Sequence, residues 1–414
     1  MNKLMDKKYL TPQNVYLVVS LSGIILFFLV AIFKRVEIFD WVMMENNSNW
    51  ATFDYFRHIH HSQYHQQMYF EKTDAVFPPL AYMMYYYIYR ISYGAFYTED
   101  YKSMLTEPYQ IIIFIMYTLI AILWLSYIIE ELQISTVKKR MLLFSIVFSV
   151  PMFAGAIERG NMALYVIVII LNALIWKDSN VYWKRELALI LIAIAAGLKV
   201  YPAVLGLIYI KEKRWKESIR LIIYGIIAFF VPFVFFGKFD GVLAYVKILT
   251  DLTNKEYGAR IQFFKGLMSF TSLSDETISI LNMLFMVGLL IAIFCTKNKL
   301  REMVYLASFM TFVPSNAFRY TLIYFLPVVY LLFTEHDDKN TPPHIDNYIY
   351  AIMLGALFSI PTVFGMLTGF RLNFGIFTYT YVERYIYTLA WGCLIYSALM
   401  ELITLGRHSR SELG

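Results

Sequence analysis

The sequence predicts an all-α protein that crosses a membrane many times. Of its 414 residues, 59% are hydrophobic and only 16% are charged. Soluble globular proteins carry roughly 25% charged residues, because a folded surface in water needs polar cover. Only two cysteines occur, so a disulfide framework is excluded as well. The composition therefore excludes a soluble enzyme, a disordered chain and a disulfide scaffold.

Apolar segments that suit membrane helices recur along the whole chain. Crossing the hydrocarbon layer takes about 20 apolar residues, so segments such as 141–156, 162–176 and 303–314 would have to be tilted, extended or broken. We expect a bundle of about twelve spans in a single integrated domain, residues 1–414, because no repeat or linker divides the chain. The candidate spans are 15–33, 77–95, 109–130, 141–156, 162–176, 187–210, 219–236, 277–295, 303–314, 320–334, 348–368 and 385–405.

Basic residues predict which ends of the spans face the cytoplasm. Lysines before the first span place the N-terminus inside, and alternation then places the basic loop 211–220 inside as well. The same alternation puts two other basic loops, 138–140 and 177–185, on the outside, against the rule. A re-entrant hairpin between residues 141 and 210 would remove this conflict. A composition rich in Lys, Ile, Tyr and Asn suggests an AT-rich bacterial genome, and hence the cytoplasmic membrane.

Two long loops, 34–76 and 237–276, fall on the outer face in this arrangement. Within the first, Asp54, His58 and His61 are followed by His65 at spacings that place all four on one helical face. We expect an amphipathic helix at the interface that holds Asp54 just above the bilayer. A carboxylate beside an aromatic, partly dry wall has a raised pKa, which would suit a general base.

The histidine face has a rival interpretation as a metal site, because histidines four residues apart can chelate a metal. The row lacks a clear set of carboxylate or cysteine partners, and the sequence contains no Asp-x-Asp motif. A Gly-rich phosphate loop is also absent, which argues against ATP hydrolysis. We therefore predict neither a metal nor a cofactor.

Four short segments, in order along the chain, resemble motifs of glycosyltransferase family 87. That family tends to show an Asp-aromatic pair in the first outer loop, Pro-Pro-Leu at the start of the second span, Arg-Gly-Asn, and Gly-x-Lys-x-Tyr-Pro. In its last motif the family usually has histidine near the position of Arg319. The matching segments are Asp54-Tyr-Phe-Arg with Phe77-Pro-Pro-Leu-Ala-Tyr82, Arg159-Gly-Asn161, Gly197-Leu-Lys-Val-Tyr-Pro202, and the weaker Pro314-Ser-Asn-Ala-Phe-Arg-Tyr320.

This resemblance covers roughly residues 15–330 and implies a GT-C fold. It also implies a membrane enzyme that moves a hexose, with mannose as the first candidate, from a polyprenyl-phosphate sugar to a glycolipid or polysaccharide acceptor. The reaction would take place on the extracytoplasmic face and invert the anomeric carbon, with Asp54 as the base. The expected partners are the donor, the acceptor and membrane lipid, without nucleic acid.

Four cations are candidates for the donor phosphate. Arginine binds phosphate oxygens through a planar fork, which favours Arg319, with Arg57 and Arg260 as alternates. Lys199 lies inside a predicted span and is therefore a functional candidate, although it could instead pair with Glu158.

Candidates for substrate contacts, from the first loop and the motifs, are His58, Tyr69, Asn161 and Tyr82. Arg159 is expected to form an ion pair with Glu158 that holds a tight helix hairpin. The tyrosines of 82–89 are typical of an interfacial aromatic belt, with sugar stacking as the alternative.

Two other functional classes remain open. A transporter or flippase for lipid-linked sugar would show inverted repeats and broken helices, and Lys199-Val-Tyr-Pro202 offers one such break without a counterpart in the second half. A polysaccharide polymerase or ligase would carry several arginines in a large late loop. Loop 237–276 contains only Arg260, which favours the transferase.

Overall fold

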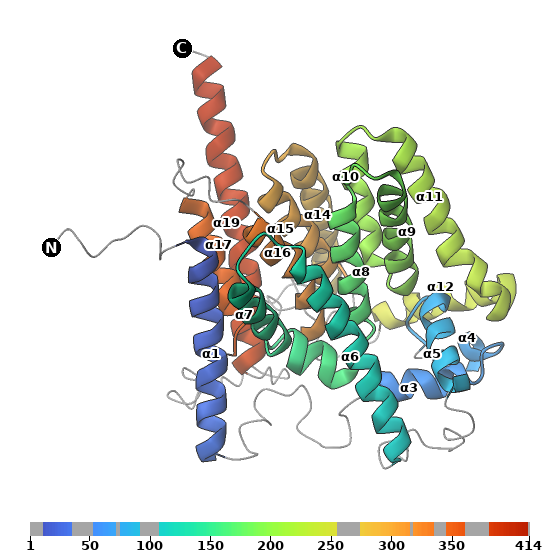
Figure 1. The fold of residues 1–414 in the computed structure, drawn as a ribbon. Helices are drawn as coiled ribbons and strands as arrows, with labels where there is room; N and C mark the ends of the chain where they lie inside the picture. The colour runs from blue at the N-terminus through green and yellow to red at the C-terminus, as the bar shows by residue number, and fades with distance from the viewer. Residues whose placement is uncertain are drawn as a thin grey trace.

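The computed structural model describes residues 11–34, 53–71, 75–91, 107–254, 274–314, 318–334, 345–360 and 381–412. Every regular element within these ranges is a helix, and none of the described residues forms a strand (Figure 1). The all-α prediction is therefore confirmed for this part of the chain.

Four described segments are long and apolar enough to cross a membrane. They are Pro12–Phe33 in α1 (Pro12–Lys34), Pro108–Glu130, which is α6, Trp215–Phe235 in α11 (Trp215–Phe230) with η4 (Val231–Phe235), and Ile386–Leu405 in α19 (Tyr381–Glu412). The chain is therefore a membrane protein, whereas the expected total of about twelve spans stays a prediction. The other helices are α3 (Phe53–Ser62), α4 (Met68–Glu71), α5 (Pro79–Ile91), α7 (Thr136–Val147), η2 (Met152–Ile157), α8 (Ala163–Trp176), α9 (Tyr182–Leu198), η3 (Tyr201–Leu205), α10 (Gly206–Lys211), α12 (Lys238–Asn254), α14 (Asp275–Cys295), α15 (Lys299–Phe312), η5 (Arg319–Phe325), α16 (Leu326–Thr334) and α17 (Ile345–Leu357).

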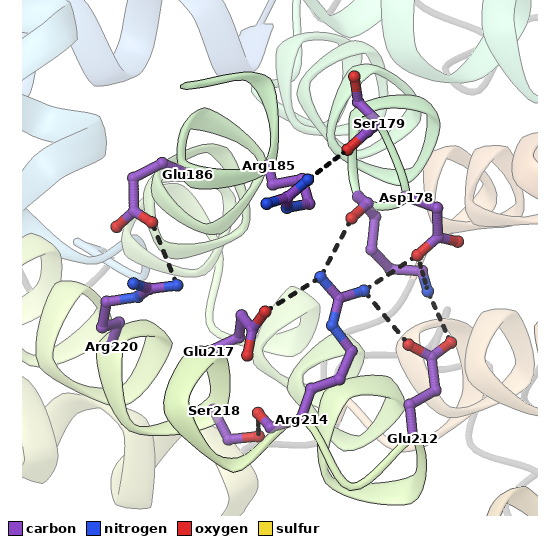
Figure 2. A network of polar contacts seen from close by, with 10 residues as sticks. Asp178, Ser179, Arg185, Glu186, Glu212, Arg214, Glu217, Ser218 and Arg220 are labelled. Carbon is purple, nitrogen blue, oxygen red and sulfur yellow. Dashed lines mark hydrogen bonds and ion pairs between the residues drawn. The ribbon is translucent and has the colours of Figure 1, made fainter. Parts of the chain in front are cut away.

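An ion-pair network joins two turns at one end of the bundle. Lys177 in the α8–α9 turn lies 2.6 Å from Glu212 in the α10–α11 turn, and Arg214 lies 2.9 Å from Asp178. Figure 2 shows Arg214 at the centre of this network, between carboxylates from both turns. The two turns therefore lie at the same end of the bundle, which we call the polar end.

The polar end also contains the start of α15 and the end of α19. Lys211 pairs with Glu302 of α15 at 3.1 Å. Arg301 pairs with Asp346 of α17 at 2.9 Å and with Glu401 of α19 at 3.1 Å. Because Arg301 and Asp346 are both buried, removing one would leave an uncompensated charge. These pairs fasten four helices to one another at this end.

The expected span 187–210 is wrong, because the structure divides it into two antiparallel segments. Helix α9 ends at Leu198, Lys199 adopts an extended backbone, and Pro202 lies in the first turn of η3. Proline has no backbone N–H and cannot continue a helix from within, so the chain turns back at this point. Helix α10 then returns to the polar end, where Glu212 meets Lys177.

The expected span 77–95 is described only as far as Ile91. Helix α5 has only 13 residues, and it packs against α3 and against the end of α9 that is far from the polar end. Helix α6 also begins beside α3 and runs away from it (Figure 1). Helix α5 therefore stays at the end opposite the polar end.

The placement of the basic loops differs from the one that alternation predicts. Helix α6 carries the chain to its turn with α7, so 138–140 lies away from α3, and 177–185 lies at the polar end with 211–220. The basic loops thus gather on the side of the bundle opposite α3. Alternation placed 177–185 and 211–220 on opposite sides because it treated 187–210 as one span, whereas the chain turns back near Pro202.

Candidate functional site

Helix α3 lies inside the protein at the end opposite the polar end. Tyr55 contacts Phe114 and Tyr117 of α6, with ring centroids 5.1 and 4.9 Å apart. On another side, the His58 ring stacks on Tyr85 of α5 at 5.6 Å. The apolar and the polar side chains of α3 are therefore both buried. The expected interfacial amphipathic helix is not confirmed, because neighbouring helices cover both of its faces.

The carboxylate of Asp54 is held by two residues from distant sequence. Arg159 Nη2 lies 2.7 Å from one carboxylate oxygen, and the amide Nδ2 of Asn161 donates to the other at 2.6 Å. Asp54 is only 8% exposed. Two directed hydrogen bonds, one of them from a cation, fix the orientation of the carboxylate. Each oxygen still has a lone pair for a substrate hydroxyl.

The local fold between η2 and α8 positions these two partners. Helix η2 is a π-helical segment, in which Ala156 N–H bonds to Pro151 C=O five residues earlier. Such segments are frequent at functional sites. Asn161 Oδ1 also accepts from the N–H of Ala163 at 2.9 Å, which ties its side chain to the first turn of α8. Asn161 therefore positions Asp54, a role that sequence did not assign to it.

Gly160 makes the tight turn between the two partners. Its φ is +61°, and a β-carbon there would lie 2.6 Å from Tyr55 Cβ. Both the left-handed backbone and this close approach require glycine. The expected tight hairpin is thus present, and Arg159 uses it to reach Asp54.

We expect Gly160→Ala to lower the free energy of unfolding by about 1–3 kcal/mol, and to lower transferase activity by moving Arg159 and Asn161. Gly225→Ala in α11 is the matched control, because its β-carbon would meet nothing within 4 Å. That control should be neutral or stabilised by up to about 1 kcal/mol. Thermal unfolding in detergent compares the two variants, and equal melting temperatures would contradict the strain at Gly160.

The electrostatics of Asp54 overturn the expected raised pKa. Burial alone raises the pKa, but the charge of Arg159 and the hydrogen bonds from Arg159 and Asn161 outweigh it. They hold the pKa of Asp54 well below its usual range. The dry aromatic surroundings are visible in the sequence, whereas the guanidinium of Arg159 reaches Asp54 only in the folded protein. Asp54 is therefore ionised at every physiological pH.

His58 and Tyr82 form a second polar pair beside Asp54. The Tyr82 hydroxyl and His58 Nδ1 share a hydrogen bond of 3.0 Å. Burial lowers the pKa of His58 to about 3, so its ring is neutral. The third predicted contact residue, Tyr69, packs on Tyr82 and donates its hydroxyl to the Phe77 carbonyl at 2.9 Å. Tyr69 therefore supports the wall of the site.

Lys199 lies between the rings of Phe77 and Tyr320. Its ammonium is 4.3 Å from the centre of the Tyr320 ring and 5.2 Å from that of Phe77, and the residue is 4% exposed. Among the described residues it makes no hydrogen bond or ion pair, so the expected alternative of a pair with Glu158 is not formed. The charge of Asp54 acts on this ammonium. A buried ammonium with ring contacts alone is suited to an anionic ligand.

The other predicted phosphate-binding arginines differ in placement. Arg57 is half-buried on α3, and its charge acts on His58 and Tyr82. Arg319 is fully buried at the start of η5, next to Tyr320. The hydrogen bonds to Asp54 and the ring contacts of Lys199 described above involve other residues. Arg260 lies outside the described residues.

Two residues of the site were missed in sequence. Arg159 was expected to pair with its neighbour Glu158, although the Arg-Gly-Asn motif contained the signal that it acts together with Asn161. The other residue, Tyr320, packs closely against Gly155 of η2: a β-carbon at Gly155 would lie 3.1 Å from Tyr320 Cα. That contact joins η2 to η5 across the fold, so sequence offers no signal for it.

The histidines of α3 do not form a metal centre in the described part of the chain. No three His, Cys, Asp or Glu side chains there are grouped so that they could hold one ion. The His58 ring lies against Tyr82 and Tyr85, and the His65 ring lies 5.0 Å from Tyr86.

Comparison with known families identifies the class of protein. The model of glycosyltransferase family 87 matches residues 102–315, slightly more than half of the chain. The chain belongs to glycosyltransferase family 87. It is therefore a membrane glycosyltransferase, which uses a sugar donor and an acceptor. Searches of curated proteins and of solved structures found no significant match.

The matched region of this glycosyltransferase contains only part of the site. Arg159, Asn161 and Lys199 lie within residues 102–315, whereas Asp54 and Tyr82 precede it and Arg319 follows it. The contacts of Asp54 thus join a carboxylate outside the match to two partners inside it.

Proposed function

We propose that this glycosyltransferase moves a hexose, with mannose as the first candidate, from a polyprenyl-phosphate sugar to a glycan or glycolipid acceptor. One juxtaposition carries the proposal. A buried carboxylate, Asp54, is oriented by Arg159 and Asn161. A buried lysine, Lys199, which forms no ion pair within the described ranges, lies close enough for the two charges to interact. The carboxylate of Asp54 suits the acceptor hydroxyl, and the ammonium of Lys199 suits the donor phosphate.

Asp54 is the proposed base. The acceptor hydroxyl would donate a hydrogen bond to a free lone pair of the carboxylate and attack the anomeric carbon from the face opposite the phosphate. The bond between the acceptor oxygen and the sugar forms, the bond between the sugar and the phosphate oxygen breaks, and the hydroxyl proton passes to Asp54. The low pKa keeps Asp54 ionised, so its carboxylate can accept the hydrogen bond of the acceptor hydroxyl. Arg159 and Asn161 orient the carboxylate, which lowers the activation barrier.

Lys199 is the proposed site for the leaving phosphate. The phosphate gains negative charge as the sugar departs, and a desolvated ammonium stabilises such charge better than a solvated one. Arg57 and Arg319 are further candidates for the same phosphate. No step in this scheme requires a metal, because protein cations can supply the charge when the leaving group carries a single phosphate.

The basic polar end supports a cytoplasmic side there, and hence a site on the extracytoplasmic face of the cytoplasmic membrane. The apolar exposed surfaces of α6 and α11 fit a lipid environment beside the site. Membership of a glycosyltransferase family favours transfer over a flippase, a transporter or a polysaccharide polymerase or ligase.

We expect Lys199→Met to lower kcat/KM for donor by about 10-fold or more, because the leaving phosphate loses a stabilising charge. The assay uses the purified full chain in detergent, polyprenyl-phosphate mannose or polyprenyl-phosphate glucose carrying a radiolabelled sugar, and a membrane-lipid acceptor extract, with and without EDTA. Lys247→Met, an exposed lysine on α12, is the control and should behave as wild type. Failure to transfer either sugar would refute the proposed donor class, and loss of activity in EDTA would restore a metal to the mechanism.

A further inference from the structure

A row of aromatic and amide side chains leads away from Asp54 to the surface. His58 and His61 follow Asp54 along α3, with ring centroids 6.1 Å apart. The row continues beyond the end of α3 to His65, whose ring meets Tyr86 of α5 at 5.0 Å. Along α3 this spans more than about 12 Å from Asp54. That distance exceeds one sugar ring and fits a short oligosaccharide.

The outer end of this row is exposed and offers hydrogen-bonding groups. Gln66 and Gln67 are exposed, and their side-chain amides make no hydrogen bond to other described residues. His65 Nδ1 is buried and also has no hydrogen-bond partner in the described part of the chain. Tyr87, beside Tyr86, is 56% exposed. Rings that can stack, next to free amides, are the groups that recognise the faces and hydroxyls of sugars.

The charge of this surface favours a neutral ligand. Residues 58–70 and 79–89 contain no Asp, Glu, Lys or Arg, and Arg90, exposed at the end of α5, is a single cation beside them. An anionic lipid headgroup would call for a cluster of basic residues. The inner tyrosines of the same cluster, Tyr82 and Tyr85, are fully buried against His58 and so do not face lipid.

We propose that His65, Gln66 and Tyr86 form a subsite for an uncharged saccharide chain, beyond the sugar that receives the transfer at Asp54. The acceptor is then a glycan of two or more sugar units. This inference rests on the proposed function, and it adds the class of acceptor and the direction from which it enters.

The test measures binding and needs no donor. Isothermal titration of the full chain in lipid nanodiscs uses linear manno- and gluco-oligosaccharides of one to four units as probes. We expect the affinity for at least one series to rise with length up to about three units. Tyr86→Ala should lower the affinity for the trisaccharide by about 3- to 10-fold and leave that for the monosaccharide unchanged. Tyr127→Ala, an exposed tyrosine far from the site on α6, is the matched control.

Several outcomes would overturn the subsite. They are affinity that does not depend on length, absence of binding by both series, and a trisaccharide affinity unchanged in Tyr86→Ala. If Tyr86→Ala instead lost stability in nanodiscs while it bound the trisaccharide normally, the ring would be a membrane-interface anchor. Transfer without length-dependent binding would refute the subsite alone. Length-dependent binding without transfer from any polyprenyl-phosphate sugar would refute the proposed function alone.

Discussion

Asp54→Asn is expected to lower the rate of sugar transfer by about 100- to 10,000-fold, the range that a positioned general base contributes. The asparagine oxygen can still accept a hydrogen bond from Arg159, and its shape is that of the carboxylate. The amide cannot take the proton of the acceptor hydroxyl, so the loss should appear in kcat with little change in the KM for donor. Transfer of radiolabelled sugar from polyprenyl-phosphate mannose measures it.

The control for this variant is Asp251→Asn, which changes an exposed carboxylate on α12 and should leave transfer unchanged. Thermal unfolding in detergent shows whether Asp54→Asn remains folded. A folded Asp54→Asn protein that transfers sugar at a rate within about 3-fold of wild type would remove Asp54 from the chemistry. Asp40, in the same loop but outside the described residues, would then be tested.

Arg159→Leu is expected to lower the free energy of unfolding by about 3–5 kcal/mol, because it leaves the Asp54 carboxylate buried without its cation. The ion pair of 2.7 Å is only 11% exposed on each side chain, so water cannot replace the guanidinium. Denaturant- or heat-induced unfolding in detergent measures the loss. In the double variant with Asp54→Leu, the second change should cost little or restore stability, since no charge stays unpaired.

Arg159 should also control how the stability of the fold and the rate of transfer depend on pH. In the wild type, the pKa of Asp54 is held well below its usual range. The ion pair therefore stabilises the fold above the unfolded pKa of about 4, and this contribution is lost as the pH falls further. Arg159→Gln raises the pKa of Asp54. The transfer rate of this variant should then begin to fall at a higher pH than that of wild type, and identical acid limbs would contradict the electrostatic role of Arg159.

Sequence alone could predict the class of fold and most of the candidate residues. Hydrophobic excess fixes a helical membrane protein, because apolar segments that long must satisfy their backbone hydrogen bonds within helices. Short motifs with a fixed order pointed to the family, and they included Asp54, Asn161 and Lys199. Proline in Tyr201-Pro202 predicted a break in its helix. All of this depends on local residue type and spacing.

Tertiary structure decided how those residues act. Arg159 reaches Asp54 across 105 residues because the Gly160 turn and α3 meet at one end of the bundle. That meeting inverts the expected pKa shift of Asp54, since the charge of a partner contributes only at short distance. The topology likewise depended on contacts. Segments 77–95 and 187–210 have similar hydropathy. Packing of α5 on α3 and the ion pair between Lys177 and Glu212 give them different paths. Apolar length permits a crossing, and only the neighbours of a helix determine whether it is made.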